Sequence, residues 1–499
     1  MNQAPVPFRR SFQTAALFCI CASILSSCIT FDDVDRFLDE LNADKTVPMT
    51  AVERDFADIT KDGVLRMVTR YGPDTYFLHR GLDAGFEFEL LHAFAREKNL
   101  MLEVEIMGPD DDPFLYLNSG RGDVIATGLS VSNHKKDGIE FTHPYLLTDR
   151  FLVYSPYLEA KPDSLTTLAE MGIPITVLAG SDGETYLKRM QDEGIELDLN
   201  QLKEDADRDL IYRKLIDGSA LVTVTDTYSF QTVSALYPGL IKGPVIAEQD
   251  SIAWAVRAGS PQLEAELSQF LQTHFRISDD GSGTYSSAFL NVLKRHYFEE
   301  SPQLTAYYDT TASETGDMLF SPYSGLVQSV ADSVEIDPLL LTAVIAQESG
   351  FNPGSKSFAG AVGLMQILPR YSENEYPTLY DPETNIREGA AILKSNLDHY
   401  AYLDSLSRVQ FALATYNAGI GHMVDARRLV MEQNRNPNDW PSTANALMLL
   451  MQRRYFERAE HGYVRGMETV QYVDRILSRY NRYKSVMALP EQQIRTAGR

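Results

Sequence analysis

The chain has 499 residues, of which 44% are hydrophobic and 23% charged, and this composition indicates a soluble protein large enough for two or three domains. The formal net charge of −24 is unevenly distributed, because residues 321–484 hold 16 basic and 18 acidic side chains and the acidic excess lies in the rest. That excess argues against nucleic acid as a partner of the N-terminal part, whereas the nearly neutral C-terminal part can approach an anionic polymer.

The first 28 residues form a segment of their own. Arg9 and Arg10 give it a basic start, and residues 15–25 form an apolar run that is too short to span a bilayer. The run ends in Leu25-Ser-Ser-Cys28, which resembles the lipobox of bacterial lipoproteins. All three cysteines of the chain lie in this segment, so a mature chain starting at Cys28 would form no internal disulfide.

This resemblance implies a lipoprotein signal peptide over residues 1–28 and a diacylated Cys28 as the lipid anchor, on the periplasmic side of a Gram-negative envelope. Ile29, and not aspartate, follows the cysteine, which in such lipoproteins implies the outer membrane. A signal peptide with an incidental cysteine is the alternative. No other stretch of the sequence is long and apolar enough to be a membrane helix.

Residues 29–55 are polar and acidic, and we expect a tether with a short amphipathic helix. Strand and helix patterns then alternate over residues 56–298, which predicts an α/β domain with a largely parallel sheet. The predicted strands are 64–69, 102–107, 123–128, 174–178, 220–224 and 252–257, and the predicted helices are 88–98, 184–193 and 208–217.

A polar, turn-rich stretch at residues 299–317 is the predicted linker. The pattern after it is helical and shows no convincing strand, which predicts an all-α domain over 318–485 and a tail over 486–499. The predicted helices are 322–334, 338–349, 386–401, 408–417, 443–458 and 466–480.

Five short segments of the α/β region together resemble periplasmic solute-binding proteins of the amino-acid-binding type. They are, in chain order, Leu65-Arg-Met-Val-Thr69, Gly85-Phe-Glu-Phe-Glu-Leu90, Gly122-Asp-Val-Ile-Ala126, Gly128-Leu-Ser-Val-Ser132 and Ile139-Glu-Phe-Thr-His-Pro-Tyr145. The resemblance covers residues 60–298 and implies two lobes with a ligand cleft between them.

Carried over by motif position, the resemblance implies a set of ligand contacts: Gly128, Ser130 and Ser132 in the first lobe, Ser181 and Gly183 in the second, and Asp226 for an ammonium group. The family usually clamps an α-carboxylate with an arginine, where this chain has Lys135, or His134 in a shifted register. Because lysine offers a point charge and not a planar fork, a muropeptide or another amino-acid-like ligand is as open as a free amino acid. A domain that has lost its ligand and only docks to the other domain is the alternative.

One glutamate of the helical region lies where an ordinary surface glutamate would not. Asp337 is the expected N-cap of the helix 338–349, Pro338 its first residue and Gly350 its stop. Glu348 shares a helix face with apolar residues three, four and seven positions before it, and it lies at the negative end of the helix dipole. Both effects raise the pKa of a carboxyl group, as a general acid near neutral pH requires, although a glutamate at a frayed helix end remains the alternative.

Four motifs in a fixed order accompany this glutamate and resemble the soluble-lytic-transglycosylase family of lysozyme-like, peptidoglycan-cleaving enzymes. They are Glu348-Ser349-Gly-Phe-Asn352-Pro353, Gly360-Ala-Val-Gly363-Leu364-Met365-Gln366-Ile367-Leu368-Pro369, Ala414-Thr-Tyr416-Asn417-Ala418-Gly419 and Glu468-Thr469-Val-Gln-Tyr472-Val473. The resemblance covers residues 320–485 and implies a lyase whose acid and base are both Glu348, with 1,6-anhydro-N-acetylmuramic acid as product. Only one carboxylate is needed, because the sugar's own C6 hydroxyl replaces an activated water.

The remaining motif positions are expected to shape the cleft and bind glycan: Ser349, Met365, Gln366, Tyr416, Asn417 and Tyr472. Met365 is expected to offer an apolar surface to a sugar, or else to pack in the core. Tyr472 is expected to hold a hydroxyl near the acid, or to be a buried structural tyrosine. Glu468 is expected to be structural, and Asp381, Glu383 and Glu388 are surface acids without a motif.

The sequence shows no metal-ligand spacing and implies neither a metal nor another cofactor. Two rival functions stay open at this point: a hydrolase that pairs Glu348 with a second acid such as Asp381, and a module that binds cell-wall glycan without cutting it. A further hypothesis is that a ligand in the N-terminal cleft regulates the enzyme domain.

Overall fold

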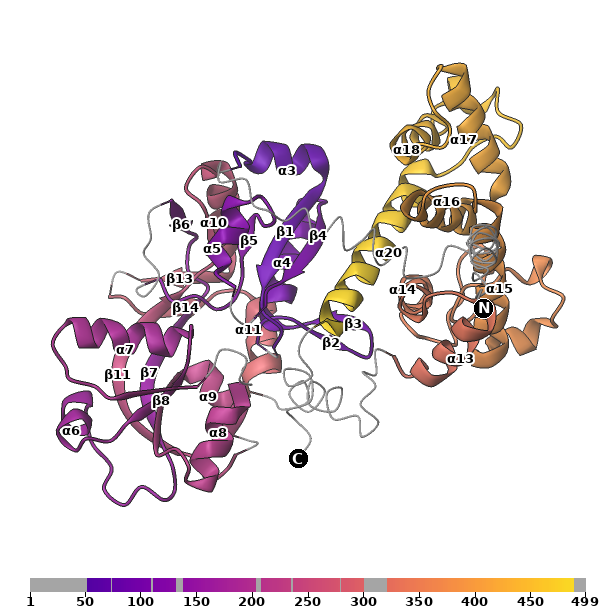
Figure 1. The fold of residues 1–499 in the computed structure, drawn as a ribbon. Coiled ribbons are helices and arrows are strands. Elements are labelled where there is room, and N and C mark those ends of the chain that lie inside the picture. The colour runs from indigo at the N-terminus through magenta and orange to yellow at the C-terminus, as the bar shows by residue number, and fades with distance from the viewer. Residues whose placement is uncertain are drawn as a thin grey trace, which may run out of the picture. The chain divides into compact units, whose positions relative to one another are not determined.

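The computed structural model describes residues 52–72, 74–108, 111–131, 138–202, 208–234, 237–278, 280–299 and 321–488 (Figure 1). These residues fall into two compact units, one holding residues up to 392 together with those from Gln471 on, the other holding 393–470. Several predictions lie outside the described residues: Cys28, and the candidate ligand residues Ser132, His134 and Lys135. Most of the expected tether, linker and C-terminal tail lies outside them as well.

The first sheet of the α/β region has five strands in the order β4-β1-β5-β12-β6. Their bounds are β1 (Val64–Thr69), β4 (Met101–Ile106), β5 (Val124–Ile125), β6 (Ile139–Phe141) and β12 (Ala255–Arg257). β1 pairs in parallel with β4 and β5, whereas β12 is antiparallel to β5 and β6. Residues 255–257 thus return to the first sheet, as the sequence indicated, although Ile252 of the predicted strand still belongs to β11 in the second sheet.

The second sheet also has five strands, in the order β11-β7-β10-β8-β9. Their bounds are β7 (Leu146–Tyr154), β8 (Ile175–Leu178), β9 (Leu199–Leu202), β10 (Val222–Asp226) and β11 (Ile241–Ile252). β7 is antiparallel to β10 and β11, and β8 is parallel to β9 and β10. The prediction of a largely parallel sheet was therefore wrong, because each sheet is mixed and the long strands β7 and β11 pair antiparallel.

Helices cover both sheets, and Figure 1 shows α4 and α10 beside the first sheet and α7 and α8 beside the second. The helices of this region are α3 (Phe56–Asp62), α4 (Phe86–Glu97), α5 (Pro113–Asn118), α6 (Leu165–Glu170), α7 (Asp182–Asp192), α8 (Arg208–Asp217), α9 (Thr227–Ser234), α10 (Pro261–His274) and α11 (Ala288–Lys294). A π-helical turn, η1 (Arg295–Glu299), follows α11, and two hairpins are formed by β2 (Phe77–His79) with β3 (Leu82–Ala84) and by β13 (Phe275–Ile277) with β14 (Gly283–Tyr285).

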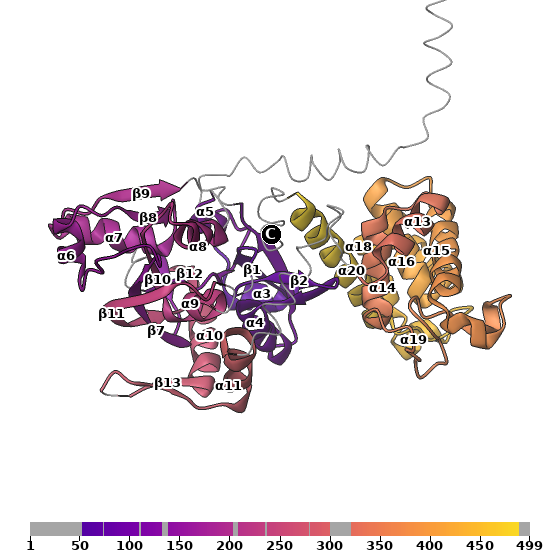
Figure 2. The ribbon, with the colours of Figure 1, turned by 90° about the horizontal axis from the view of Figure 1, so that it is seen from below.

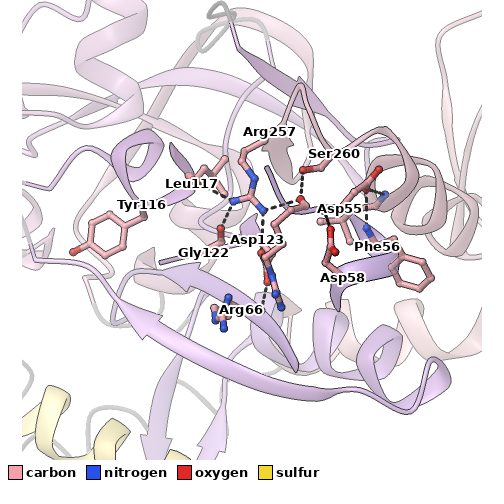
Figure 3. Close-up of polar contacts among 12 residues, drawn as sticks. Asp55, Phe56, Asp58, Arg66, Tyr116, Leu117, Gly122, Asp123, Arg257 and Ser260 are labelled. Atoms are coloured by element: carbon pink, nitrogen blue, oxygen red, sulfur yellow. Dashed lines mark hydrogen bonds and ion pairs between the residues drawn. The ribbon is translucent and has the colours of Figure 1, made fainter. Parts of the chain in front are cut away.

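A buried ionic network ties the start of the described chain to the first sheet (Figure 3). Asp123 is fully buried and accepts from Arg54 Nε at 3.1 Å, from Arg257 Nη2 at 3.0 Å and from the backbone of Arg66 at 3.1 Å. Arg257 also donates to the Leu117 carbonyl at 2.8 Å. Both arginine side chains of the network thus pair with the Asp123 carboxylate, and losing that carboxylate would leave their charges buried without it.

The described residues from Ser321 on form helices, turns and isolated bridges but no strand ladder, as predicted (Figure 2). In the larger unit these are α13 (Ser324–Val334), α14 (Pro338–Ser349), the 3₁₀ turns η2 (Pro369–Tyr371) and η3 (Tyr376–Tyr380), and the first part of α15 (Pro382–His399). The unit also holds α20 (Gly466–Met487) from Gln471 on.

The smaller unit contains the end of α15 and the start of α20 with four helices between them: α16 (Ser405–Ala418), α17 (Ile420–Glu432), α18 (Trp440–Leu449) and α19 (Arg453–Phe456). The sequence missed α17, and it predicted one helix over 443–458 where the chain breaks into α18 and α19. None of the described helices is long and apolar enough to cross a membrane.

Candidate active site and ligand cleft

Helix α14 carries Glu348 in its last turn, and the signals that begin and end it are those predicted. The Asp337 side chain accepts from the Leu339 N–H at 2.7 Å, Pro338 is the first helical residue, and Gly350 ends the helix with φ 56°. Every residue from Leu340 to Ala346 is buried. The helix is thus enclosed on all sides and not only along the one apolar face that the spacing predicted.

Glu348 itself is half-buried, and its carboxyl group has a defined partner. The Tyr472 hydroxyl, from α20, donates to Glu348 Oε1 at 2.6 Å. Burial raises the pKa of Glu348 to about 7, while the Tyr472 hydrogen bond works in the opposite direction. A carboxyl group with such a pKa can give up a proton and take one back near neutral pH, and the role of Glu348 as acid and base stays a prediction.

Asn385 binds the loop of the second motif through hydrogen bonds to its backbone, and the sequence analysis did not identify this residue. Its fully buried side chain accepts from the Met365 N–H at 2.7 Å and donates to the carbonyls of Val362 and Leu379 at 3.0 and 2.8 Å. Gly363 has φ +79°, and a Cβ there would meet Asn385 Nδ2 at 2.2 Å. The glycine of the motif is thus required for this close approach, and a buried asparagine near a helix start was the available cue.

The other motif residues expected beside Glu348 make contacts within the protein: Met365, Gln366 and Ser349. Met365 has no exposed area and packs against Gly389, where a Cβ would lie 2.5 Å from its sulfur, so it does not present the expected apolar surface to solvent. Gln366 is half-buried with φ 51°, and its amide donates to the Gly363 carbonyl at 2.9 Å. Ser349 donates back to the Ile345 carbonyl at 3.2 Å. Their contact with glycan stays a prediction.

The third and fourth motifs meet in the smaller unit. Asn417, exposed at the end of α16, accepts from the Thr469 hydroxyl at 2.8 Å, and Tyr416 beside it is half-buried. Thr469 lies one turn before Tyr472 on α20. This hydrogen bond fixes the Asn417 amide, and its role toward an acetamido group stays a prediction.

Each of the other acids weighed from the sequence has a local partner within the protein. Glu468 is exposed and pairs with Arg465 at 3.3 Å. Asp381 caps α15 by accepting from the Thr384 N–H and hydroxyl at 2.9 Å, and these hydrogen bonds hold the pKa of Asp381 below its usual range. Glu383 pairs with Arg387 at 2.8 Å, and Glu388 accepts from Ser372 at 2.8 Å.

The candidate ligand residues of the α/β region occupy loop and strand ends. Ser130 is fully buried and donates to Asp250 Oδ2, on β11, at 2.5 Å. Ser181 caps α7 by accepting from the Glu184 N–H at 3.2 Å, and a Cβ at Gly183 would lie 2.9 Å from Val224. Asp226, at the end of β10, accepts from the N–H groups of Tyr228 and Ser229 at 2.9 and 3.0 Å.

Glu87 lies behind Gly128 and was not recognised from the sequence. Its side chain is 3% exposed and accepts from the Tyr145 hydroxyl and from Trp254 Nε1, the latter at 2.8 Å. Burial raises the pKa of Glu87 to about 7, although these donors and the Gly128 N–H favour its charged form. The one cue was a carboxylate between phenylalanines in a motif that otherwise resembles core.

Among the residues that the structure describes, no group of three or more histidine, cysteine or acidic side chains is arranged to hold a metal ion.

Comparison with known proteins gives both halves of the chain a family. The family model "Transglycosylase SLT domain" matches residues 325–438, and "Bacterial extracellular solute-binding proteins, family 3" matches residues 65–282. The chain is similar to membrane-bound lytic murein transglycosylase F of Desulfosudis oleivorans, at 30% identity over 86% of this chain and 92% of the relative. The protein of the same name from Shewanella halifaxensis is 30% identical over 83% of this chain and 84% of its own length. Among solved structures, an ancestral arginine-binding protein bound to arginine has 21% identity and a TM-score of 0.39, covering 47% of this chain and 98% of its own.

Proposed function

The chain belongs to the membrane-bound lytic murein transglycosylase F family of peptidoglycan-cleaving enzymes, and from this premise we propose that it cuts the MurNAc-β-1,4-GlcNAc bond without water and leaves 1,6-anhydro-MurNAc ends. The observation that supports this most is Glu348, a carboxyl group with a pKa of about 7 at the end of a buried helix, held by Tyr472. One group with this pKa can serve both proton transfers of the reaction.

In the proposed mechanism, protonated Glu348 donates its proton to the glycosidic oxygen as the bond from that oxygen to C1 of the muramic acid breaks. The Glu348 carboxylate then takes the proton of the C6 hydroxyl of the same sugar while O6 forms a bond to C1. No water is consumed, and Glu348 is protonated again at the end. Because the nucleophile belongs to the substrate, its proximity replaces the second carboxylate of a hydrolase.

The Tyr472 hydroxyl supports this exchange by fixing the Glu348 carboxyl group and by stabilising its charged form after the first transfer. We propose that Ser349, Gln366, Tyr416 and Asn417 line the glycan cleft with hydrogen-bonding groups. Met365 has no exposed area and supports the loop from inside, so the core-packing alternative is the one that we propose for it.

Against the hydrolase alternative, the Asp381 carboxylate accepts two hydrogen bonds from Thr384 as a helix cap. A binding module without activity would not need a glutamate with a raised pKa. The test is digestion of purified peptidoglycan by the chain from about residue 30, beside Glu348→Gln, with mass spectrometry of the products. Anhydro-ended muropeptides that disappear in the variant support the proposal; reducing ends would establish a hydrolase, and uncut but bound glycan a binding module.

For the α/β domain, we propose a regulatory cleft that binds an amino-acid-like ligand or a muropeptide through Gly128, Ser130, Ser132, Ser181 and Asp226, with Lys135 toward a carboxylate. Support comes from the family 3 match and from Ser130, a hydroxyl without exposed area at the end of a motif loop. Regulation requires the ligand to bind the active arrangement better than the inactive one. A ligand that binds tightly by calorimetry yet leaves turnover unchanged would contradict it.

We further propose that the protein is held at the periplasmic face of the outer membrane by a lipid on Cys28, since the relatives are named membrane-bound and Leu25-Ser-Ser-Cys28 resembles a lipobox. Radiolabelled palmitate should be incorporated by the full chain and not by Cys28→Ser. Fractionation of both forms would then separate anchoring at the outer membrane from release into the periplasm.

A further inference from the structure

Helix α20 contacts both ends of the helix that carries Glu348. Tyr472 donates to Glu348 at the C-terminal end of α14, and Tyr480 donates to Asp337 Oδ2 at its N-cap, at 2.6 and 2.5 Å. Tyr472 and Tyr480 are eight positions apart on α20, a rise of about 12 Å, and Asp337 and Glu348 are eleven positions apart, about 16 Å. The two hydrogen bonds thus lie at opposite ends of α14 and follow in reverse order along α20. Both tyrosine side chains are 6% exposed, and Ile476 between them has no exposed area.

Ten residues beyond Tyr472, nearly three turns, the same helix has a third polar contact. Arg482 Nε and Nη2 donate to Oδ1 and Oδ2 of Asp83, on β3, both at 2.9 Å, in a planar two-point ion pair. Asp83 also accepts from the Tyr76 hydroxyl at 2.8 Å, and Tyr483 donates to the Gly81 carbonyl. All these residues and Glu348 belong to one compact unit.

The Asp83–Arg482 pair is deeply buried, with side-chain exposures of 10% and 8%. Burial works against the charge of Asp83, yet Arg482 and Arg479 keep the pKa of Asp83 below its ordinary value. A buried pair of this kind adds little net stability compared with apolar residues, but it fixes one register, because either charge left alone is costly. The pair therefore limits how far α20 can slide or turn relative to β3.

We propose that Arg482 is a positioning residue for Glu348: its two-point contact with Asp83 fixes α20, and α20 holds Glu348 through Tyr472 and the start of α14 through Tyr480. This rests on the proposed role of Glu348 as acid and base. Arg482 touches neither Glu348 nor its hydrogen-bond partner, so its effect is on placement and not on binding of glycan. Losing it should then lower kcat and leave KM nearly unchanged.

The test compares Arg482→Ala and Arg482→Lys with wild type and with Arg475→Ala, which removes an exposed arginine of the same helix. We expect Arg482→Ala to lower kcat on the order of tenfold to a hundredfold with KM within about twofold. Arg482→Lys should recover only part of the loss, because lysine keeps the charge but not the planar two-point contact. Hydrogen exchange of the amides of 338–349 should rise in Arg482→Ala and stay at the wild-type level in Arg475→Ala. A folded Arg482→Ala with wild-type kcat and exchange would overturn the proposal.

Tyr480→Phe repeats the test without leaving a buried charge, in case Arg482→Ala does not fold. It removes one hydroxyl from α20 and keeps the ring, so a severalfold lower kcat with unchanged KM supports the positioning role, and wild-type kcat overturns it. Hydrogen exchange separates the positioning role of Arg482 from the proposed function. If wild type forms no anhydro product, the proposed function fails. The positioning role is then still tested by whether Arg482→Ala raises exchange of the amides of 338–349.

Discussion

The Tyr472 hydroxyl lies 2.6 Å from Glu348 Oε1, and it donates to that oxygen from a helix more than a hundred residues further along the chain. Burial alone would favour a permanently protonated Glu348, which could act as an acid but not return as a base. The hydroxyl offsets part of this effect, and the pKa of Glu348 comes to about 7. The balance between the two residues is therefore what permits both halves of the proposed reaction.

Tyr472→Phe should move the alkaline limb of kcat/KM to higher pH, by about one unit, because a hydrogen bond to a charged group contributes roughly 1.5–3 kcal/mol. The sign follows from the donor: the hydroxyl stabilises the charged carboxylate, so removing it raises the pKa of Glu348 further, and the acid form persists to higher pH. kcat should fall as well, since the returning base is less stable. A pH profile of muropeptide release checks this, and a limb that stays in place or moves down would contradict it.

Glu348→Gln should abolish turnover yet stabilise the fold at alkaline pH. The folded-state pKa of about 7 lies above the ordinary glutamate value of 4.5, so the folded state binds more protons than the unfolded chain between these values, and wild-type stability falls as pH rises through the window. The variant lacks this loss and should be more stable by up to about 3 kcal/mol above pH 7, with no difference near pH 4. Urea unfolding of wild type and the variant at pH 4.5 and 8 measures the difference between their free energies of unfolding at each pH. An equal difference at the two pH values would contradict the raised pKa of Glu348.

Local signals in the sequence sufficed for some elements of the fold. The strand over 64–69, the helix over 338–349 and the helix over 208–217 have the predicted bounds, because a cap, a stop or a run of apolar residues marks each of them within a few positions. Glu348 was found for the same reason: its surroundings are set mainly by its own helix and the motifs beside it.

Relationships between distant segments could not be predicted in this way. The antiparallel pairing of β7 with β11 depends on register across some hundred residues, and no local pattern encodes it. Helix α17 begins with Ile420-Gly-His, a start without a capping side chain, so the predicted boundaries missed it. Asn385 and Glu87 are polar side chains inside apolar surroundings, and only the partners that the fold brings to them show what they do.

Asn385→Ala should destabilise the chain by about 2–4 kcal/mol and reduce turnover. The change leaves the Met365 N–H and the carbonyls of Val362 and Leu379 without their partner in a buried place, and each unsatisfied group costs about 1–3 kcal/mol, less where the backbone relaxes. Asn374→Ala is the matched control, because Asn374 is exposed and donates to Glu388 at the surface. Thermal unfolding of both variants, with turnover below the transition, tests this; equal melting temperatures would contradict it.

Titration of Glu87 in the α/β domain should be visible as a change of tryptophan fluorescence. The reason is that Trp254, one of the two tryptophans of the chain, donates a hydrogen bond to the Glu87 carboxyl group. In a Trp440→Phe background, Trp254 fluorescence should change with a midpoint near pH 7, where the Glu87 carboxyl group loses its proton and its hydrogen bond to Trp254 Nε1 strengthens. Glu87→Gln in the same background should remove the transition, because the amide does not titrate. Since the Gly128 N–H also faces this carboxylate, a ligand bound at Gly128 should shift the midpoint. A transition that persists in Glu87→Gln would place its origin in another group, and a midpoint near the ordinary glutamate value would show that burial does not hold the proton on Glu87.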